Sequence, residues 1–177
     1  MAHKCILSQV EIARILERLA YEIIEKHGDC KDIVLVGIER RGADLARRIQ
    51  KILQEKTQHP ITLSTLDINL YRDDWTTMES TPHVGTSRMI APVTGASILL
   101  IDDVLYTGRT IRSALEAIMD YGRPSRVELL VLIDRGRREL PIQADYVGRS
   151  IPTTAREHVD VLLSERDGTD EVHIVHE

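Results

Sequence analysis

Residues Ser97 to Ile111 read SILLIDDVLYTGRTI, and this stretch decides the fold that we expect for the whole chain. It opens with the apolar run Ile98 to Ile101, which is typical of a strand buried on both faces of a parallel sheet. Two adjacent carboxylates, Asp102 and Asp103, come where that strand should end, and a turn of small and polar residues follows. A helix then begins, with apolar residues at helical spacing: Ile111, Ala114, Leu115 and Ile118.

The turn between that strand and that helix is suited to bind an anion. Free backbone N–H groups and the helix dipole both point at it. Thr107 and Thr110 add hydroxyl donors, and Gly108 lets the backbone close around a phosphate. The neighbouring Asp102 and Asp103 could accept hydrogen bonds from ribose hydroxyls and help to hold Mg²⁺, so the pattern indicates a sugar-phosphate site.

Two other interpretations of this stretch compete with a sugar-phosphate site. An ordinary buried strand with a polar end is the simplest, but paired carboxylates that run into a Thr-Gly-Arg-Thr turn are rarer than that. A nucleoside triphosphatase also places an acid after an apolar strand, but it needs a GxxxxGK loop followed by Ser or Thr. The nearest match, Gly37 to Gly42, is followed by Ala43 and Asp44 in place of the lysine and the hydroxyl. The missing lysine argues against a triphosphatase.

Leu99 to Ile111 resembles the phosphoribosyl-diphosphate loop of the type I phosphoribosyltransferases at nearly every position, in the expected strand–turn–helix context. The resemblance implies that phosphoribosyl diphosphate is bound by Leu99, Leu100, Ile101, Asp102, Asp103, Val104, Leu105, Tyr106, Thr107, Gly108, Arg109, Thr110 and Ile111. It also implies an α/β fold of this type, with a central, mainly parallel sheet flanked by helices, a flexible flap and a small C-terminal hood.

The composition is that of an ordinary soluble protein. Its 177 residues suit a single α/β domain, residues 1–177, and the chain is 29% charged and 42% apolar. We find no apolar signal region and no window long enough to span a bilayer, which indicates a cytoplasmic protein without a membrane partner. The two cysteines form neither a disulfide framework nor a metal-binding spacing. The net charge of −5 argues against nucleic-acid binding by bulk charge, although it leaves room for a local basic face.

A similar strand, turn and helix come earlier in the chain. Ser8 to Glu11 form an S-x-x-E capping box that starts a first helix, and Ile33 to Ile38 predict another buried strand. That strand runs into Arg40 and Arg41, and a second apolar helical stripe follows. Because ligands of open α/β sheets lie beyond the carboxyl ends of the strands, both arginines should share an edge with the paired carboxylates. An arginine pair ahead of a helix is often simply exposed to solvent. Here the anion-binding turn at residues 106–110 should lie at the same edge of the sheet, and this favours diphosphate binding by the arginines.

The segment between these two units should be a strand followed by a long loop. Ile61 to Tyr71 is rich in β-branched residues, with a change of apolar phase that indicates a bulge or a change of burial. Residues 72–88 are polar and have no helical stripe, and a loop of this length in a compact domain is usually functional or disordered. We expect a mobile flap over the site, carrying Arg72, Asp73, Asp74 and Trp75.

Further strands should follow the central motif. Their expected ranges are Val127–Ile133, Ala144–Val147, His158–Leu163 and Val172–Val175. His158, His173 and His176 lie on or near the last two strands without a second ligand pattern, so we expect no metal site there.

Several longer stretches are similar, from end to end of the chain, to one bacterial family, the bifunctional pyrimidine operon attenuation regulators and uracil phosphoribosyltransferases. They are VGIERRGADLARRI (36–49), LDINLYRDD (66–74), LLIDDVLYTGRTIR (99–112), GRPSRVELLVLIDRGRRELPIQADYVG (122–148) and IPT (151–153). The resemblance implies uracil, phosphoribosyl diphosphate and UMP as ligands and Mg²⁺ as the cofactor. It also implies a homodimer or higher homo-oligomer, and binding of an mRNA leader that pyrimidine nucleotides tune.

The residues suit the chemistry of such an enzyme. Transfer of the ribosyl group to uracil needs a stabilised diphosphate leaving group and no covalent nucleophile. Arg40, Arg41 and Mg²⁺ would neutralise the diphosphate. Asp102 and Asp103 would fix the ribose, contact the metal indirectly through the substrate, and favour the developing cation. We therefore expect Asp102, Asp103 and Arg41 to be catalytic; the opposite hypothesis is an RNA-binding protein whose nucleotide site is only a sensor.

A local basic region favours RNA binding. Residues 123–149 carry six arginines and four acids, a net charge of +2, whereas the rest of the chain is −7. The family resemblance implies that Arg137, Arg138, Arg149 and Thr153 contact RNA. The chain departs from the family with Arg137 in place of a histidine and Gln143 in place of an arginine, and the second change removes one RNA contact. The alternative function is therefore an enzyme with little or no RNA-binding role.

Overall fold

The computed structural model describes residues 3–71 and 87–176, and its centre is a parallel sheet. Within these residues five strands pair in the order β3-β2-β4-β5-β6, and every neighbouring pair is parallel. Their bounds are β2 Ile33–Ile38, β3 Thr62–Leu66, β4 Ser97–Leu105, β5 Arg126–Asp134 and β6 Tyr146–Ser150. This arrangement confirms the predicted α/β architecture.

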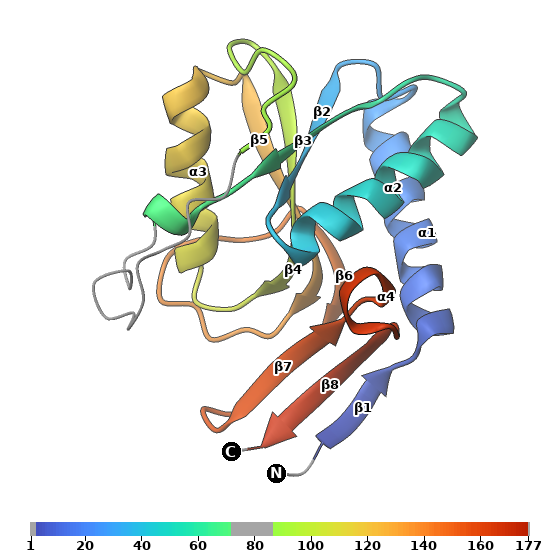
Figure 1. Cartoon of the computed structure of the whole chain (residues 1–177), viewed down its shortest axis with the longest axis vertical. Helices are drawn as coiled ribbons and strands as arrows, with labels where there is room; N and C mark the ends of the chain where they lie inside the picture. The colour runs from blue at the N-terminus through green and yellow to red at the C-terminus, as the bar shows by residue number, and fades with distance from the viewer. Residues whose placement is uncertain (1–2, 72–86, 177) are drawn as a thin grey trace.

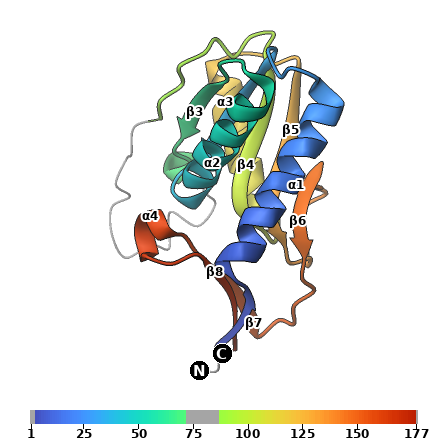
Figure 2. The same cartoon turned by 90° about the vertical axis from the view of Figure 1, so that its right-hand side faces the viewer.

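Helices cover both faces of this sheet (Figures 1 and 2). α1 (Gln9–His27) and α2 (Arg41–Thr57) pack on one face, and α3 (Arg109–Tyr121) packs on the other. The predicted capping box forms at the start of α1, where the backbone N–H of Ser8 donates to Glu11 Oε2 at 2.9 Å. The residues of the apolar stripes predicted for all three helices are buried, except Leu115 of α3, which is half-buried. Hydrophobic spacing in the sequence therefore fixes how each helix faces the sheet.

A second, antiparallel sheet forms the hood beneath the carboxyl edge of the parallel sheet (Figure 1). Its order is β1 (His3–Leu7), β8 (Glu171–His176) and β7 (Glu157–Leu162), and the short helix α4 (Ser164–Asp167) joins β7 to β8. The predicted hood was C-terminal, but the structure adds β1 from the start of the chain. Arg48 of α2 holds the hood, because it donates to Glu165 at 2.8 Å and to Asp170 at 2.9 Å.

Three predicted boundaries differ from the structure. β4 continues through Asp102 and Asp103 to Leu105, because β5 pairs with it beyond the point where its pairing with β2 stops. β3 ends at Leu66, and the 3₁₀ helix η1 (Asn69–Tyr71) follows. The register of β2 with β3 is regular, so the phase change in this strand reflects a change of burial and no bulge. The strand predicted at Ala144–Val147 starts two residues later than expected, at Tyr146 of β6.

Among the described residues, no helix combines the length and the apolar character that a membrane span requires.

Candidate functional site

A polar pocket of about 280 Å³ lies at the carboxyl edge of the parallel sheet. Its lining residues are Ile38, Glu39, Arg40, Arg41, Ile68, Asn69, Asp102, Asp103, Val104 and Thr110. The two turns that sequence reasoning paired therefore meet in one cavity, with the arginine pair on one wall and the carboxylate pair on another.

A glycine allows the two walls to approach each other closely. A Cβ atom on Gly42, in the first turn of α2, would lie 2.5 Å from the carbonyl oxygen of Ile101 and 3.1 Å from the Cα atom of Asp102. Any side chain at this position would push α2 away from β4. Gly42 thus sets the spacing between the arginines that precede it and the carboxylates of β4.

The environment of Asp102 and Asp103 disfavours the ionised forms of both carboxyl groups. Asp102 is 6% exposed, and burial, followed by repulsion from Asp103, raises the pKa of Asp102 well above its ordinary value. Burial also raises the pKa of Asp103, although hydrogen bonds with Asp102 and with the Val104 N–H and the charge of Arg41 partly oppose that rise. The Val104 N–H donates to Asp103 Oδ1 at 2.9 Å and so orients this carboxyl group. Buried carboxyls that are costly to ionise without a partner are typical of functional sites.

We expect Asp102→Asn to stabilise the ligand-free protein at neutral pH by about 0.5 to 2 kcal/mol, the usual range for a single stabilising substitution. The folded pKa of Asp102 is raised, so the unfolded chain releases this proton at a lower pH than the folded chain. Stability from this group is therefore present at low pH and lost as the pH rises through the folded pKa. Thermal melts of both proteins across pH should show the variant's advantage growing toward neutral pH. An advantage that shrinks as the pH rises would contradict this.

The arginine pair has one member with an unsatisfied group. Arg41 donates to Asp167 of the hood, with Nη2 at 3.2 Å from Oδ1. Its Nε atom is buried and has no hydrogen-bond partner in the part of the chain that the structure describes. Arg40 is exposed at the N-terminal end of α2. A buried guanidinium N–H without a partner beside the pocket is suited to receive an anionic oxygen.

The turn before α3 is shaped by backbone contacts. Gly108 has φ +93° at the N-cap of α3, in the left-handed region that favours glycine. The carbonyl of Thr107 accepts hydrogen bonds from the backbone N–H groups of Glu139 (2.9 Å) and Leu140 (3.0 Å), and Arg138 donates to the Tyr106 carbonyl at 2.9 Å. The segment after β5 therefore supports the turn from behind.

The predicted phosphoribosyl-diphosphate motif, residues 99–111, contains both buried residues that support the site and residues that line the pocket. Five of its apolar members are at most 2% exposed and lie in the core: Leu99, Leu100, Ile101, Leu105 and Ile111. Asp102, Asp103, Val104 and Thr110 line the pocket, and Tyr106, Thr107, Gly108 and Arg109 form the turn beside it. The predicted flap residues Arg72, Asp73 and Asp74 lie outside the described residues.

Four residues that line the pocket were not predicted as site residues from the sequence: Ile38, Glu39, Ile68 and Asn69. Ile68 and Asn69 follow β3, whose carboxyl end meets the same edge of the sheet as those of β2 and β4. The carboxyl end of this third strand thus carries site residues, as do the carboxyl ends of the other two strands.

The donor set of the pocket fits Mg²⁺. The ion prefers carboxylate, water and phosphate oxygens, and it usually uses one or two carboxylates together with the substrate. Asp102 and Asp103 supply such oxygens. Burial raises their pKa values and so disfavours their ionised forms, and a nearby cation would offset this cost.

The residues expected to contact RNA fall into two groups. Thr153 is 9% exposed and accepts a hydrogen bond from Arg135 Nε at 3.0 Å. Arg138 donates to the Ile142 carbonyl at 2.8 Å and to Asp134 at 2.6 Å, in addition to its bond to the turn. These two side chains therefore act within the protein, whereas Arg137 and Arg149 are exposed.

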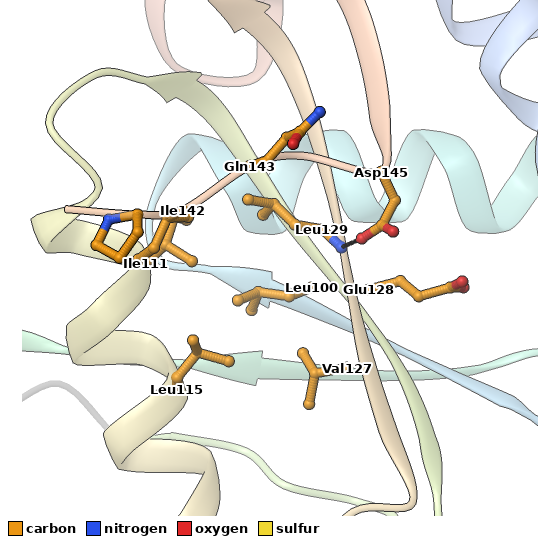
Figure 3. Close-up of a pocket in the computed structure, with 10 residues that line it drawn as sticks. Leu100, Ile111, Leu115, Val127, Glu128, Leu129, Ile142, Gln143 and Asp145 are labelled. Carbon is orange, nitrogen blue, oxygen red and sulfur yellow. Dashed lines mark hydrogen bonds between the residues drawn. The ribbon is translucent and has the colours of Figure 1, made fainter. Parts of the chain in front are cut away.

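Gln143 lies apart from Arg149. It lines a second pocket of about 220 Å³ between α3, β5 and the connection from β5 to β6, with apolar residues such as Leu115 and Leu129 (Figure 3). Arg149 lies on the α1 side, where it donates to the Ile6 carbonyl at 3.2 Å. The structure thus does not bring Gln143 and Arg149 together on one face.

Known proteins were compared with the sequence and the fold. Residues 4–166 match the family model described as the phosphoribosyl transferase domain. The bifunctional protein PyrR of Chloroflexus aurantiacus is 51% identical over 172 residues, covering 97% of this chain and 94% of that protein. The bifunctional protein pyrR of Enterococcus faecalis is 47% identical over 174 residues, covering 98% and 97%.

Solved structures share the fold at low identity. The hypoxanthine phosphoribosyltransferase of Trypanosoma cruzi superposes with a TM-score of 0.74 at 15% identity, over 98% of this chain and 96% of that one. A hypoxanthine phosphoribosyltransferase of Staphylococcus aureus gives a TM-score of 0.69 at 22% identity, over 98% and 92%. At these identities the similarity concerns the architecture alone.

Proposed function

The chain belongs to the phosphoribosyl transferase family and, within it, to the bifunctional PyrR proteins, and on this premise we propose which of its residues serve catalysis and which serve RNA binding. The protein is a uracil phosphoribosyltransferase, which converts uracil and phosphoribosyl diphosphate to UMP and diphosphate. It is also a pyrimidine-responsive regulator of pyrimidine biosynthesis genes. One observation carries the assignment of the catalytic site: the buried carboxylate pair and the arginine pair line the same pocket at the carboxyl edge of the sheet.

The pocket suggests a role for each group. The turn of residues 106–110 would hold the 5′-phosphate through its N–H and hydroxyl groups, and this remote contact would orient C1′. Asp102 and Asp103 would accept hydrogen bonds from the ribose hydroxyls. Arg40 and Arg41 would bind the diphosphate and stabilise its charge as it leaves. Mg²⁺, held by the two aspartates through the substrate, would supply further charge neutralisation when bound.

A panel of bases tests this catalytic assignment. Purified protein incubated with phosphoribosyl diphosphate and Mg²⁺ should form a nucleotide from uracil, and it should form little from hypoxanthine, the base named in its structural neighbours. Chromatography of the products distinguishes UMP from the purine nucleotide. Equal use of hypoxanthine would contradict the uracil assignment.

RNA binding would use Arg137 and Arg149, the two exposed residues of the predicted set. Arg137 lies in the segment after β5 that contacts the turn before α3. Binding of a nucleotide phosphate in that turn could therefore alter how Arg137 is presented to an mRNA leader. The assembly would be a homodimer or a higher homo-oligomer, as the family resemblance implies.

Arg137→Ala should weaken binding of the operon leader RNA and flatten its salt dependence, because one phosphate contact is lost. The slope of log affinity against log salt should fall by about 0.7 for single-stranded RNA. Filter binding across salt concentrations, with and without UMP, measures both effects. Arg47→Ala is the matched control, since it removes the same charge from an exposed position on α2, outside the basic region of residues 123–149. Weak, UMP-independent binding that neither change alters would favour the enzyme without an RNA role.

A further inference from the structure

We propose that the hood carries a transition-metal site, formed by Cys5, Glu171 and His173, and that Zn²⁺ is the ion it takes. One potential ligand atom from each of these residues lies within 4.8 Å of the other two. Sequence patterns do not indicate this site, because Cys5 and His173 are far apart in the chain and neither belongs to a ligand-spacing motif. The expectation that no metal site involves His173 is therefore replaced by this proposal.

The pairing of β1 with β8 brings these three side chains together. Cys5 is the direct partner of His173 across the antiparallel ladder, and Glu171 lies two residues before His173 on the same strand. Residues two apart on a strand share a face, so Glu171 and His173 point the same way, and the intervening Val172 is fully buried on the other face.

A β-bulge lets Cys5 join this outer face. Leu7 is fully buried, and in a regular strand Cys5 would share its face. The register shifts between Cys5 and Leu7, so that Leu7 pairs with Val172 and the strand gains one residue at this point. The bulge therefore points Leu7 into the core and leaves Cys5 exposed beside His173, which is how bulges re-aim side chains.

The chemistry of the three ligands selects the ion. A thiolate, an imidazole and a carboxylate together suit Zn²⁺, which often binds three protein ligands and a water molecule, at bond lengths of about 2.0 to 2.3 Å. Mg²⁺ prefers oxygen ligands alone and fits this set poorly. His173 Nε2 lies 2.7 Å from Glu171 Oε2, and Cys5 Sγ contacts the Leu7 carbonyl at 3.4 Å. An ion would replace both contacts after small side-chain rotations, with the loss of the thiol proton.

The site is separate from the diphosphate pocket, since none of its three residues lines that pocket. Binding can therefore be measured without an activity assay. Tag-free protein titrated with Co²⁺ should develop a thiolate-to-cobalt charge-transfer band at one equivalent, and Zn²⁺ should then displace the cobalt.

Cys5→Ser and His173→Gln should each weaken Zn²⁺ binding at least tenfold, because even loss of an outer-shell partner costs about 10- to 100-fold. Cys30→Ala and His59→Gln are matched controls, since they remove the other thiol and a half-buried imidazole outside the cluster and should keep the parent affinity. Circular dichroism checks that each variant is folded.

A second measurement on the unmodified sequence does not depend on the variants folding. Zn²⁺ should slow alkylation of the exposed Cys5 at least tenfold, and mass mapping of the modified peptide identifies the thiol. Affinity that neither Cys5→Ser nor His173→Gln reduces, or an alkylation rate of Cys5 that Zn²⁺ leaves unchanged, would overturn the proposal.

Discussion

Asp103→Asn is expected to lower kcat/KM for UMP synthesis by about two to three orders of magnitude, the loss seen when one preorganised electrostatic contact to a transition state is removed. Asp103 lines the pocket, and its carboxyl group is oriented by the Val104 N–H. Asparagine keeps the size of the side chain and one oxygen, but it loses the negative charge that would favour the cationic ribosyl group and hold Mg²⁺ through the substrate. Steady-state kinetics with varied phosphoribosyl diphosphate measure the change.

Two controls show whether this loss is specific. Thermal melting should leave the variant at least as stable as the parent, because burial raises the pKa of Asp103 in the folded chain. Asp32→Asn removes an exposed carboxylate at the opposite end of the parallel sheet and should keep the parent rate. An Asp103→Asn enzyme that turns over uracil at the parent rate would show that the ribose role is assigned to the wrong residue.

Arg41→Ala should weaken binding of phosphoribosyl diphosphate by about 10- to 100-fold, in line with loss of a hydrogen bond to a charged group. Its effect on UMP should be much smaller, because UMP carries no diphosphate. Arg41 lines the pocket together with the carboxylate pair, and its buried Nε atom has no hydrogen-bond partner within the described ranges. Calorimetric titration of the two ligands measures the difference.

Arg47→Ala provides the comparison for Arg41→Ala. Arg47 lies on the same helix and pairs with Asp44 outside the pocket lining, so its loss should change neither affinity by more than about twofold. If Arg41→Ala weakens both ligands equally, or weakens neither of them, Arg41 does not recognise the diphosphate and the assignment is wrong.

Local sequence patterns predicted most of the parallel sheet and the position of its site. Continuous apolar runs marked β2, β4 and β5, because strands buried on both faces need no polar alternation. The rule that ligands lie at the carboxyl edge then predicted that Arg41 and Asp102 share one site, and both line the same pocket.

The features that sequence reasoning missed depend on contacts between distant segments. β4 runs past Asp103 because β5 continues to pair with it, and no local pattern reports such pairing. The hood gains β1 from the other end of the chain, and the bulge that exposes Cys5 beside His173 exists only because β1 pairs with β8. Arg138 and Thr153 looked like surface residues of a basic region, but their hydrogen bonds to Asp134 and Arg135 turn them inward.

The most direct test of the central claim is the stoichiometry of diphosphate release. Protein is mixed with excess phosphoribosyl diphosphate and Mg²⁺, and diphosphate and UMP are measured in the same samples with and without uracil. We predict many turnovers per chain, one UMP for each diphosphate, and release that depends on uracil. Protein that binds phosphoribosyl diphosphate and UMP but releases no diphosphate with uracil present would contradict the account, because the pocket would then be a sensor and not a catalytic site.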